Sequence, residues 1–122
     1  MNLETLCTYL LSKPGAVADH PFGPQPLVVK VGGKMFALVA EQATPPELSL
    51  KCEPAHAQFL RDSFPAVRPG YHLNKEHWNS ITLDGSIPDA GIYTMIDESY
   101  ALVVKRLSKA VRQHLEAMQE AG

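Results

Sequence analysis

The chain has 122 residues, of which 45% are hydrophobic and 20% are charged. This length and composition are typical of one globular domain that needs no disulfide or metal to hold its core, and they exclude a disordered chain. Eleven lysines and arginines against thirteen acidic residues give a formal net charge of −2. A protein whose main task is to bind phosphates usually has a basic excess. The net charge therefore argues against a strong nucleic-acid binder, unless basic residues form a local patch.

The N-terminal residues predict a cytoplasmic protein. Met1 to Glu4 contain no basic region followed by an apolar run, so no signal peptide is expected. No stretch approaches the ~18 consecutive apolar residues of a membrane span.

Cys7 and Cys52 fall at apolar positions and are expected to be buried free thiols, with a disulfide or a reactive site as the alternatives. We expect a single domain over residues 1–122.

The first predicted element is a helix. Apolar residues from Leu3 to Leu11 recur at the i, i+3, i+4, i+7 spacing of one helix face. Asn2 can cap the start of this helix, and Pro14-Gly15 ends it. Residues 16–26 contain three prolines and one glycine, so they are predicted to form a connection.

Three antiparallel strands are predicted next, in sequence order. Residues 27–31 and 34–39 are two β-prone runs that flank Gly32-Gly33, and a two-residue glycine turn of this kind is typical of a hairpin. Residues 48–52 alternate between apolar and polar side chains, as in a strand with one face toward solvent.

A helix, two strands and two further helices follow. Pro54 suits the first turn of a helix that runs to about Phe64, with Ala55, Phe59 and Leu60 facing inward. The remaining predicted elements are strands at residues 71–73 and 79–83, a helix that begins at a Ser86–Asp89 capping box and continues to Leu107, and a last helix from Ser108 to Met118. The order α-β-β-β-α-β-β-α-α predicts a two-layer α+β fold, in which helices pack on an antiparallel sheet of about five strands.

The segment from Arg68 to Trp78 is the most unusual part of the chain, because basic residues are interleaved with aromatic ones. Cations can meet phosphates while flat rings stack on bases, so this mixture suits contact with nucleic acid. In the alternative, the segment is a hairpin in which Tyr71 and Trp78 pack on the core. Lys30 and Lys51 should stand on the sheet face opposite their apolar neighbours, where they would belong either to a binding groove or to an ordinary mixed surface.

The sequence contains no convincing catalytic or metal-binding pattern, so we expect neither an enzyme nor a cofactor. His72 and His77 could bind a metal together with Glu76 or Asn74, but structural zinc takes four ligands and catalytic zinc about three. No G-x-S-x-G motif is present. Gly32-Gly33-Lys34 lacks the spacing of a phosphate-binding loop and is predicted to be a hairpin turn.

Segments along nearly the whole chain resemble the MmcQ/YjbR family of small bacterial proteins. The segments are Lys13-Pro14-Gly15, Pro21-Phe22-Gly23-Pro24, Gly33-Lys34-Met35-Phe36-Ala37, Leu48-Ser49-Leu50-Lys51-Cys52, Pro69-Gly70-Tyr71-His72-Leu73-Asn74-Lys75-Glu76-His77-Trp78, Leu83-Asp84-Gly85-Ser86 and Pro88-Asp89. The block from Gly70 to Trp78 is the most specific of them. The resemblance implies an antiparallel sheet with helices packed across it, similar to type III secretion chaperones and to a wing-type DNA-binding domain of a phage transcription factor.

The resemblance also implies a non-enzymatic DNA-binding protein, because family members are commonly described as predicted DNA-binding proteins. Lys51, Arg68 and Lys75 would then meet phosphates, and the other polar residues of the family pattern would contact bases or sugars. The residues that the family pattern places in this site are Lys51, Arg68, His72, Asn74, Lys75, His77 and Trp78.

Two other functions stay open. A protein-interaction or chaperone-like module would use the sheet face or the C-terminal helices from Pro88 to Met118 to bind a peptide or a second copy of the chain. A small-ligand or enzymatic role would need His72, His77 and Trp78 to converge in a pocket. The expected partner is therefore DNA or a protein, and no membrane contact is expected.

Overall fold

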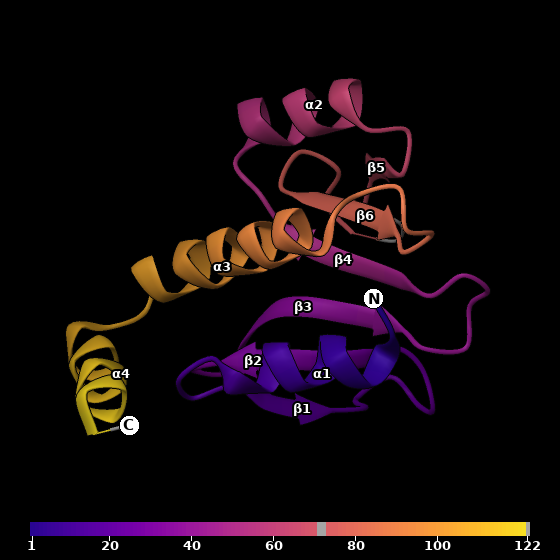
Figure 1. The fold of residues 1–122 in the computed structure, drawn as a ribbon. Helices are drawn as coiled ribbons and strands as arrows, with labels where there is room; N and C mark the ends of the chain where they lie inside the picture. Colours follow the sequence, from indigo (N-terminus) through magenta and orange to yellow (C-terminus); the bar gives the residue numbers. More distant parts are fainter. Residues whose placement is uncertain (71–72, 122) are drawn as a thin grey trace.

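The chain folds into two layers, a six-stranded sheet and a set of helices that pack against one of its faces (Figure 1). The computed structural model describes residues 1–70 and 73–121. The helices are α1 (Leu3–Ser12), α2 (Pro54–Ser63), α3 (Asp89–Lys105) and α4 (Lys109–Ala121). The strands are β1 (Val17–Asp19), β2 (Leu27–Val31), β3 (Lys34–Ala40), β4 (Glu47–Lys51), β5 (Val67–Pro69) and β6 (Trp78–Thr82). The strand order is β1-β2-β3-β4-β6-β5, and every neighbouring pair is antiparallel, which confirms the predicted α+β fold class.

The hairpin predicted around Gly32-Gly33 is confirmed. β2 pairs with β3 directly across this turn, with Val31 opposite Lys34. Both glycines have a left-handed backbone, with φ of 58° and 79°, as a two-residue turn between right-twisted strands requires. β4 pairs with β3 on its other side, so the three strands predicted in sequence order are neighbours in the sheet.

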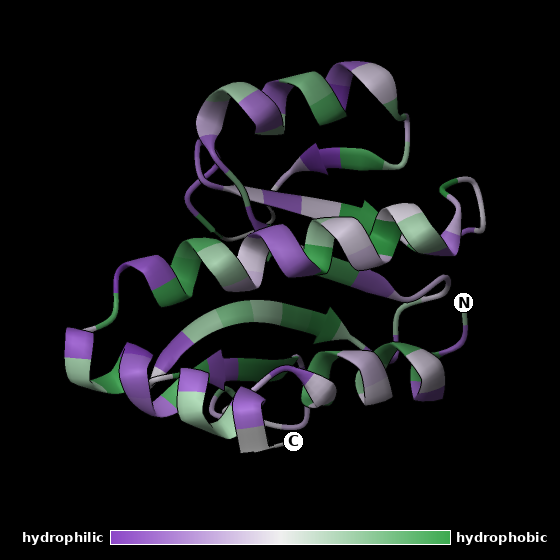
Figure 2. Cartoon of the chain, turned by 60° about the vertical axis from the view of Figure 1, so that its left-hand side comes forward, coloured by the Kyte–Doolittle hydropathy of each residue, from purple (hydrophilic) through white to green (hydrophobic). Residues whose placement is uncertain are grey.

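The apolar core lies between the sheet and the helices α1, α2 and α3. Helix α3 packs on β2, β3 and β4, and α2 packs on β5 and β6. Alternate residues of the central strands reach the same cluster as Leu6 and Leu10 of α1, and the strand members include Val29, Val39, Leu48 and Ile81. Figure 2 shows apolar residues concentrated in the strands, while each helix carries both apolar and polar residues. This arrangement follows from the period-two pattern of the strands and the amphipathic pattern of the helices.

Helix α4 packs against the turns at one end of the sheet. Leu115 of this helix and Leu107, two residues before it, are buried, and they lie against Gly15 and Gly32 respectively. Val111 and Met118 of the same helix are exposed. In the ranges 1–70 and 73–121, no helix combines the length and the apolar character that crossing a membrane requires.

The sheet has one strand more than predicted, and the differences are at its two edges. β1 lies within residues 16–26, which were predicted to form a connection, and its three residues are all exposed, so no apolar alternation marks it. β5 comes before Gly70, whereas the predicted strand was at residues 71–73; residues 71 and 72 lie outside the described residues, and Leu73 is in a bend. β6 begins one residue before the predicted strand at 79–83.

Helix α2 buries Leu60 as predicted, but not the other two residues that were expected to face inward. Phe59 and Ala55 are exposed, while Ala57 and Leu60 are buried. The helix packs mainly on β5 and β6, at one end of the sheet, and its His56 also pairs with Glu98 of α3 at 3.1 Å. Phe59 stacks on the imidazole of His56 within the helix instead, with ring centroids 6.0 Å apart.

Helix α3 does not begin at the predicted capping box. Its N-cap residue is Pro88, and no side chain caps it. Ser86 donates both its N–H and its hydroxyl to Asp84 Oδ1, at 2.9 and 2.6 Å. The serine therefore belongs to a turn before the helix, as expected where an aspartate side chain mimics a backbone turn.

Strands β3 and β4 separate near Lys51, and a side chain from α3 fills the gap between them. The last backbone pair places Ala37 opposite Leu50. Beyond it, Ser99 Oγ accepts the Lys51 N–H at 2.9 Å and donates its proton to the Phe36 carbonyl at 2.6 Å. Ser99 has no exposed surface, so one buried hydroxyl replaces strand pairing at the point where β4 ends.

Candidate nucleic-acid interface

The sheet face opposite α1, α2 and α3 carries the predicted lysines, and we refer to it as the open face. Side chains alternate along each strand, so Lys30, Leu38 and Ser49 point away from the core residues next to them. Lys51 and its cross-strand partner Trp78 point to the same face. The prediction that Lys30 and Lys51 stand opposite their apolar neighbours therefore matches the strand register.

Trp78 is buried, with 8% of its surface exposed, although it lies on the open face. It forms a small second cluster with Val28 and Leu38, and the half-buried Met35 and Leu73 pack against this cluster. An indole held in this way supports the sheet from outside the main core. It offers no open ring on which a base could stack.

Lys51 is half-buried at the end of β4 and has other cations close to it. Burial lowers the pKa of its ammonium group, and the charges of Arg106 and Lys34 lower it further. The cause is that burial and like charges both disfavour the protonated form. Lys34, in the hairpin of β2 and β3, and Arg106, at the end of α3, therefore both lie near Lys51.

Arg68 and Lys75 already have partners within the protein. The Arg68 guanidinium forms an ion pair with Glu47, which it reaches across β6. The Lys75 ammonium donates to the carbonyl of Gly70 at 3.2 Å. Contact with a phosphate would have to replace these interactions, and that cost makes both residues weaker candidates than Lys51.

Asn74 and His77 shape the turn that leads into β6. Asn74 Oδ1 accepts the Glu76 N–H at 2.9 Å, and its carbonyl accepts the His77 N–H at 3.2 Å. The carbonyl of the half-buried His77 accepts the Cys52 N–H at 2.8 Å, which ties this turn to the end of β4. His72 lies outside the described residues.

Gly70 lies where the chain approaches itself closely at the end of β5. Its N–H donates to the Trp78 carbonyl at 2.8 Å. A Cβ atom at Gly70 would lie 2.7 Å from the Cβ of Trp78, so a larger residue would push β5 and β6 apart.

Arg61 and Asn79 form a clamp that the sequence pattern does not reveal. Arg61 Nε donates to Asn79 Oδ1 at 2.7 Å, and its guanidinium also donates to the carbonyls of Lys75 and Trp78. Asn79 is buried, and its amide donates to the Ala57 carbonyl at 3.3 Å. The clamp connects α2 to the turn and to β6. No local spacing links positions 61 and 79, so the sequence carries no signal for it.

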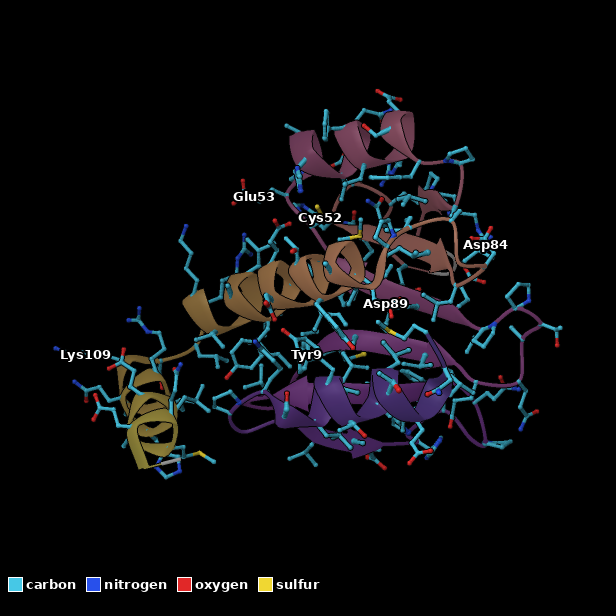
Figure 3. The ribbon with its side chains drawn as sticks, viewed as in Figure 1. Tyr9, Cys52, Glu53, Asp84, Asp89 and Lys109 are labelled. Atoms are coloured by element: carbon cyan, nitrogen blue, oxygen red, sulfur yellow. The ribbon has the colours of Figure 1, made fainter. Side chains whose placement is uncertain are left out.

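Seven of the eleven lysines and arginines gather at one end of the molecule. The turn between β2 and β3, the end of α3 and the helix α4 lie together at the left of Figure 1, and Lys51 joins them through its proximity to Lys34 and Arg106. Figure 3 shows Lys109 at this end, while Asp84 lies at the opposite side of the molecule. The seven residues, which we refer to as the basic end, are Lys30, Lys34, Lys51, Lys105, Arg106, Lys109 and Arg112.

The basic end differs from the other cations in its interactions. Within the part of the chain that the structure describes, none of its seven side chains takes part in an ion pair or a hydrogen bond. The four remaining cations all have a polar partner, and these are Lys13, Arg61, Arg68 and Lys75. Glu98, a carboxylate of α3, pairs with His56 at 3.1 Å, and Glu116 and Glu120 lie on later turns of α4. The basic end is therefore a local excess of unpaired positive charge on a protein whose net charge is −2.

A pocket of about 520 Å³ hollows the open face. Met35, Leu38 and Ser49 of β3 and β4 line it from the sheet, Phe22 and Pro26 from the loop after β1, and Leu73 from the loop before β6. The lining is mostly apolar. A pocket of this size and character lies in the range of sites that hold small organic groups.

The potentially reactive thiols are held in the protonated form. Burial first and the charge of Glu98 second raise the pKa of Cys52 to about 11, and burial also raises the pKa of Cys7. Both cysteines are free, although Cys7 is only half-buried. A protonated thiol is a poor nucleophile and a poor metal ligand. Within residues 1–70 and 73–121, no group of three His, Cys, Asp or Glu side chains is placed to hold a metal ion.

Comparisons with known proteins agree on one family. The family model described as YjbR matches residues 11–102. An Escherichia coli K12 protein with the name "Uncharacterized protein YjbR" is 39% identical over 115 residues, which cover 94% of this chain and 98% of that protein. An Escherichia coli O157:H7 protein, "Uncharacterized protein YbdF", is 37% identical over 106 residues, which cover 87% of each.

Solved structures show the same fold. The crystal structure of Deinococcus radiodurans protein DR2400, described with the domain name DUF419, superposes with a TM-score of 0.89 at 36% identity, over 94% of this chain and 88% of that one. A crystal structure of a Pseudomonas syringae protein superposes with a TM-score of 0.73 at 29% identity, over 84% of this chain and 99% of that one.

Proposed function

The chain belongs to the YjbR family, and we propose that it is a cytoplasmic DNA-binding protein without catalytic activity. The observation that carries the proposal is the basic end. Its cations have no internal partner in the described part of the chain, so each can displace a counterion from a phosphate without breaking an interaction in the protein. Glu53 and Glu98 line a pocket together with Lys105, so they reduce the positive charge locally. Carboxylates more than about 8–10 Å from the basic end are largely screened at physiological salt and do not oppose this binding.

The proposal shifts the phosphate contacts away from part of the site predicted from the sequence. Lys51 belongs to the basic end and keeps its proposed role. Arg68 and Lys75 have partners of their own, so we propose that they hold β5 and the turn before β6 in shape. Asn74 and His77 belong to the same turn. We propose no catalytic activity for two reasons. The two described thiols are protonated, so they are poor nucleophiles. A surface that carries only positive charge can bind an anion but offers no group that cleaves a bond.

Salt dependence of DNA binding tests this proposal. We expect the wild-type protein to bind a short labelled duplex, with an affinity that falls steeply between ~50 and ~200 mM salt. The variant Lys34→Gln/Lys51→Gln/Arg106→Gln removes three charges and keeps long polar side chains. The slope of log affinity against log salt should become shallower by about one for each cation that no longer meets a phosphate, or about three in all. Fluorescence anisotropy of the labelled duplex measures both quantities.

The control for this experiment is Lys75→Gln, which makes the same chemical change at a cation that is already engaged with Gly70. Its slope should equal that of the wild type. No binding at the lowest salt would remove the proposal, and equal slopes for the triple variant and the control would move the DNA-binding surface away from the basic end.

A protein-interaction module is the second candidate, and the pocket on the open face is the observation that favours it. Apolar hollows on a surface are common docking sites for partners. If this candidate is right, altering the pocket abolishes binding of a protein partner. The wild-type protein then shows no salt-dependent binding of DNA.

A further inference from the structure

The pocket on the open face has no part in the phosphate contacts proposed above, yet two of its lining residues lie next to cations of the basic end. Met35, which lines the pocket, is the direct cross-strand partner of Lys30. Ser49, which also lines it, precedes Lys51 by two residues on the same strand and the same face, or about 7 Å. Two cations of the basic end therefore border an apolar hollow.

The polar groups of the pocket already have partners, so the pocket holds no free charge. Glu47 is paired with Arg68, and the hydroxyl of Ser49 lies 2.8 Å from that of Ser80. Gln25 exchanges two hydrogen bonds with Gln42, at 2.8 and 3.1 Å. A ligand that suits this site is uncharged and flat or apolar within the pocket, and it carries a negative charge at the end near Lys30 and Lys51.

We propose that the pocket holds an unpaired base of a single-stranded nucleic acid, whose phosphates lie on the basic end. This inference rests on the proposed function and narrows it, because a base inside a duplex is stacked and paired and cannot enter the pocket. Phe22 lines the pocket and has 64% of its surface exposed, so it offers a ring on which a base can stack.

An acidic peptide with apolar side chains is the competing ligand, and the sheet face suits it less well. Peptide N–H and C=O groups need hydrogen-bond partners when they leave water. The strands beneath the pocket use their own N–H and C=O groups within the sheet, and the polar side chains of the pocket are engaged. A base has its polar groups on its edge and two flat faces free for apolar contact, so it makes fewer demands on the pocket.

Binding of a labelled oligothymidylate, compared with a duplex of the same thymidylate strand and its complement, tests the inference. We expect the wild-type protein to bind the single strand about five times more tightly than the duplex. Phe22→Ala should weaken binding of the single strand about tenfold and leave binding of the duplex unchanged. The matched control is Phe59→Ala in α2, since Phe59 is 61% exposed and remote from the pocket, and it should change neither affinity.

The emission of Trp78 gives a second measurement that needs no variant. Trp78 is the only tryptophan, and it packs on Leu38 and Leu73, which line the pocket. Its fluorescence should change when oligothymidylate is added and should change much less when the duplex is added.

The outcomes separate the inference from the proposed function. If Phe22→Ala behaves like Phe59→Ala, or if the duplex binds more tightly than the single strand, the inference fails while the proposed function stands. If neither nucleic acid binds at low salt, the proposed function fails as well. If a peptide of alternating aspartate and leucine binds in a way that needs Phe22, and oligothymidylate does not, the pocket is a protein site and the inference is overturned.

Discussion

Ser99 is the residue on which the junction between α3 and the sheet depends. Its hydroxyl serves two backbone groups that no strand pairs, the Lys51 N–H and the Phe36 carbonyl. Ser99→Ala leaves both groups buried without a partner. Because an unsatisfied buried polar group loses its hydration without compensation, we expect the free energy of unfolding to fall by about 1–3 kcal/mol. Urea denaturation measures this change.

Ser12→Ala is the matched control for Ser99→Ala. The Ser12 hydroxyl donates to the Tyr9 carbonyl at 2.6 Å, but it does so at the exposed end of α1. Water can replace this bond, so the change should stay within about 0.5 kcal/mol. Equal losses of stability in the two serine variants would show that the gap between β3 and β4 does not need the hydroxyl of Ser99.

Single residues were predictable from the sequence where alternation decides their position. Leu48 and Leu50 fix the buried face of β4, and Lys51 therefore has to point the other way. The ion pair of Arg68 with Glu47 was not predictable, because Glu47 is 21 residues away and its strand, β4, is separated from β5 by β6. The burial of Trp78 was not predictable either, because Leu73 packs against its cluster on the open face and no local pattern encodes this contact.

At the scale of elements, a small polar network connects α1 to α3. The hydroxyl of Tyr9 donates to Asp97 Oδ1 at 2.6 Å, and the ammonium group of Lys13 donates to the same oxygen at 2.8 Å. Burial by itself would raise the pKa of Asp97, but these two hydrogen bonds and the charge of Lys13 outweigh it and lower the pKa below its ordinary value of 3.8. The bond to Asp97 raises the pKa of Tyr9 to about 12.

The network predicts a dependence of stability on acid pH. A carboxyl whose pKa is lower in the folded protein stabilises the fold above its unfolded pKa, and this contribution is lost as pH falls through the folded pKa. Asp97→Asn removes the titrating group, so the variant should be less stable than wild type at neutral pH. The difference should narrow below about pH 4, as protonation of Asp97 weakens the wild type. Denaturation at a series of pH values measures it.

Asp62→Asn is the matched control, since Asp62 accepts a bond only from Gln58 within its own helix, at 2.9 Å. The free energy of unfolding of Asp62→Asn should differ little from that of the wild type at neutral pH. A gap between wild type and Asp97→Asn that stays constant down to the lowest pH would contradict the network as described.

Elements were predictable where a periodic pattern is strong. The helix from Leu3, the glycine hairpin and the three central strands follow directly from spacing and turn chemistry. β1 and β5 were missed because each is three residues long and lies at an edge, so exposure removes the alternation that identifies a strand. In α2, Leu60 was predicted correctly but Ala55 and Phe59 were not, because the position of the helix on the sheet decides which of its residues are buried.

At the scale of the whole molecule, the net charge of −2 hides an uneven distribution. Four cations lie within eight residues, from Lys105 to Arg112, and this run is the part of the basic end that the sequence displays. Lys30, Lys34 and Lys51 join it only because the hairpin and the end of β4 fold toward the end of α3. Composition therefore underestimates the capacity of the molecule to bind a polyanion.

Amide chemical-shift mapping by NMR, during titration with a short DNA at low salt, locates the DNA-binding surface residue by residue. If DNA binds at the basic end, the largest shifts fall at Lys30 to Lys34, at Lys51 and from Lys105 to Arg112, and they shrink as salt is added. Shifts concentrated instead between Arg68 and His77, or no shifts at any DNA concentration, would contradict binding at the basic end.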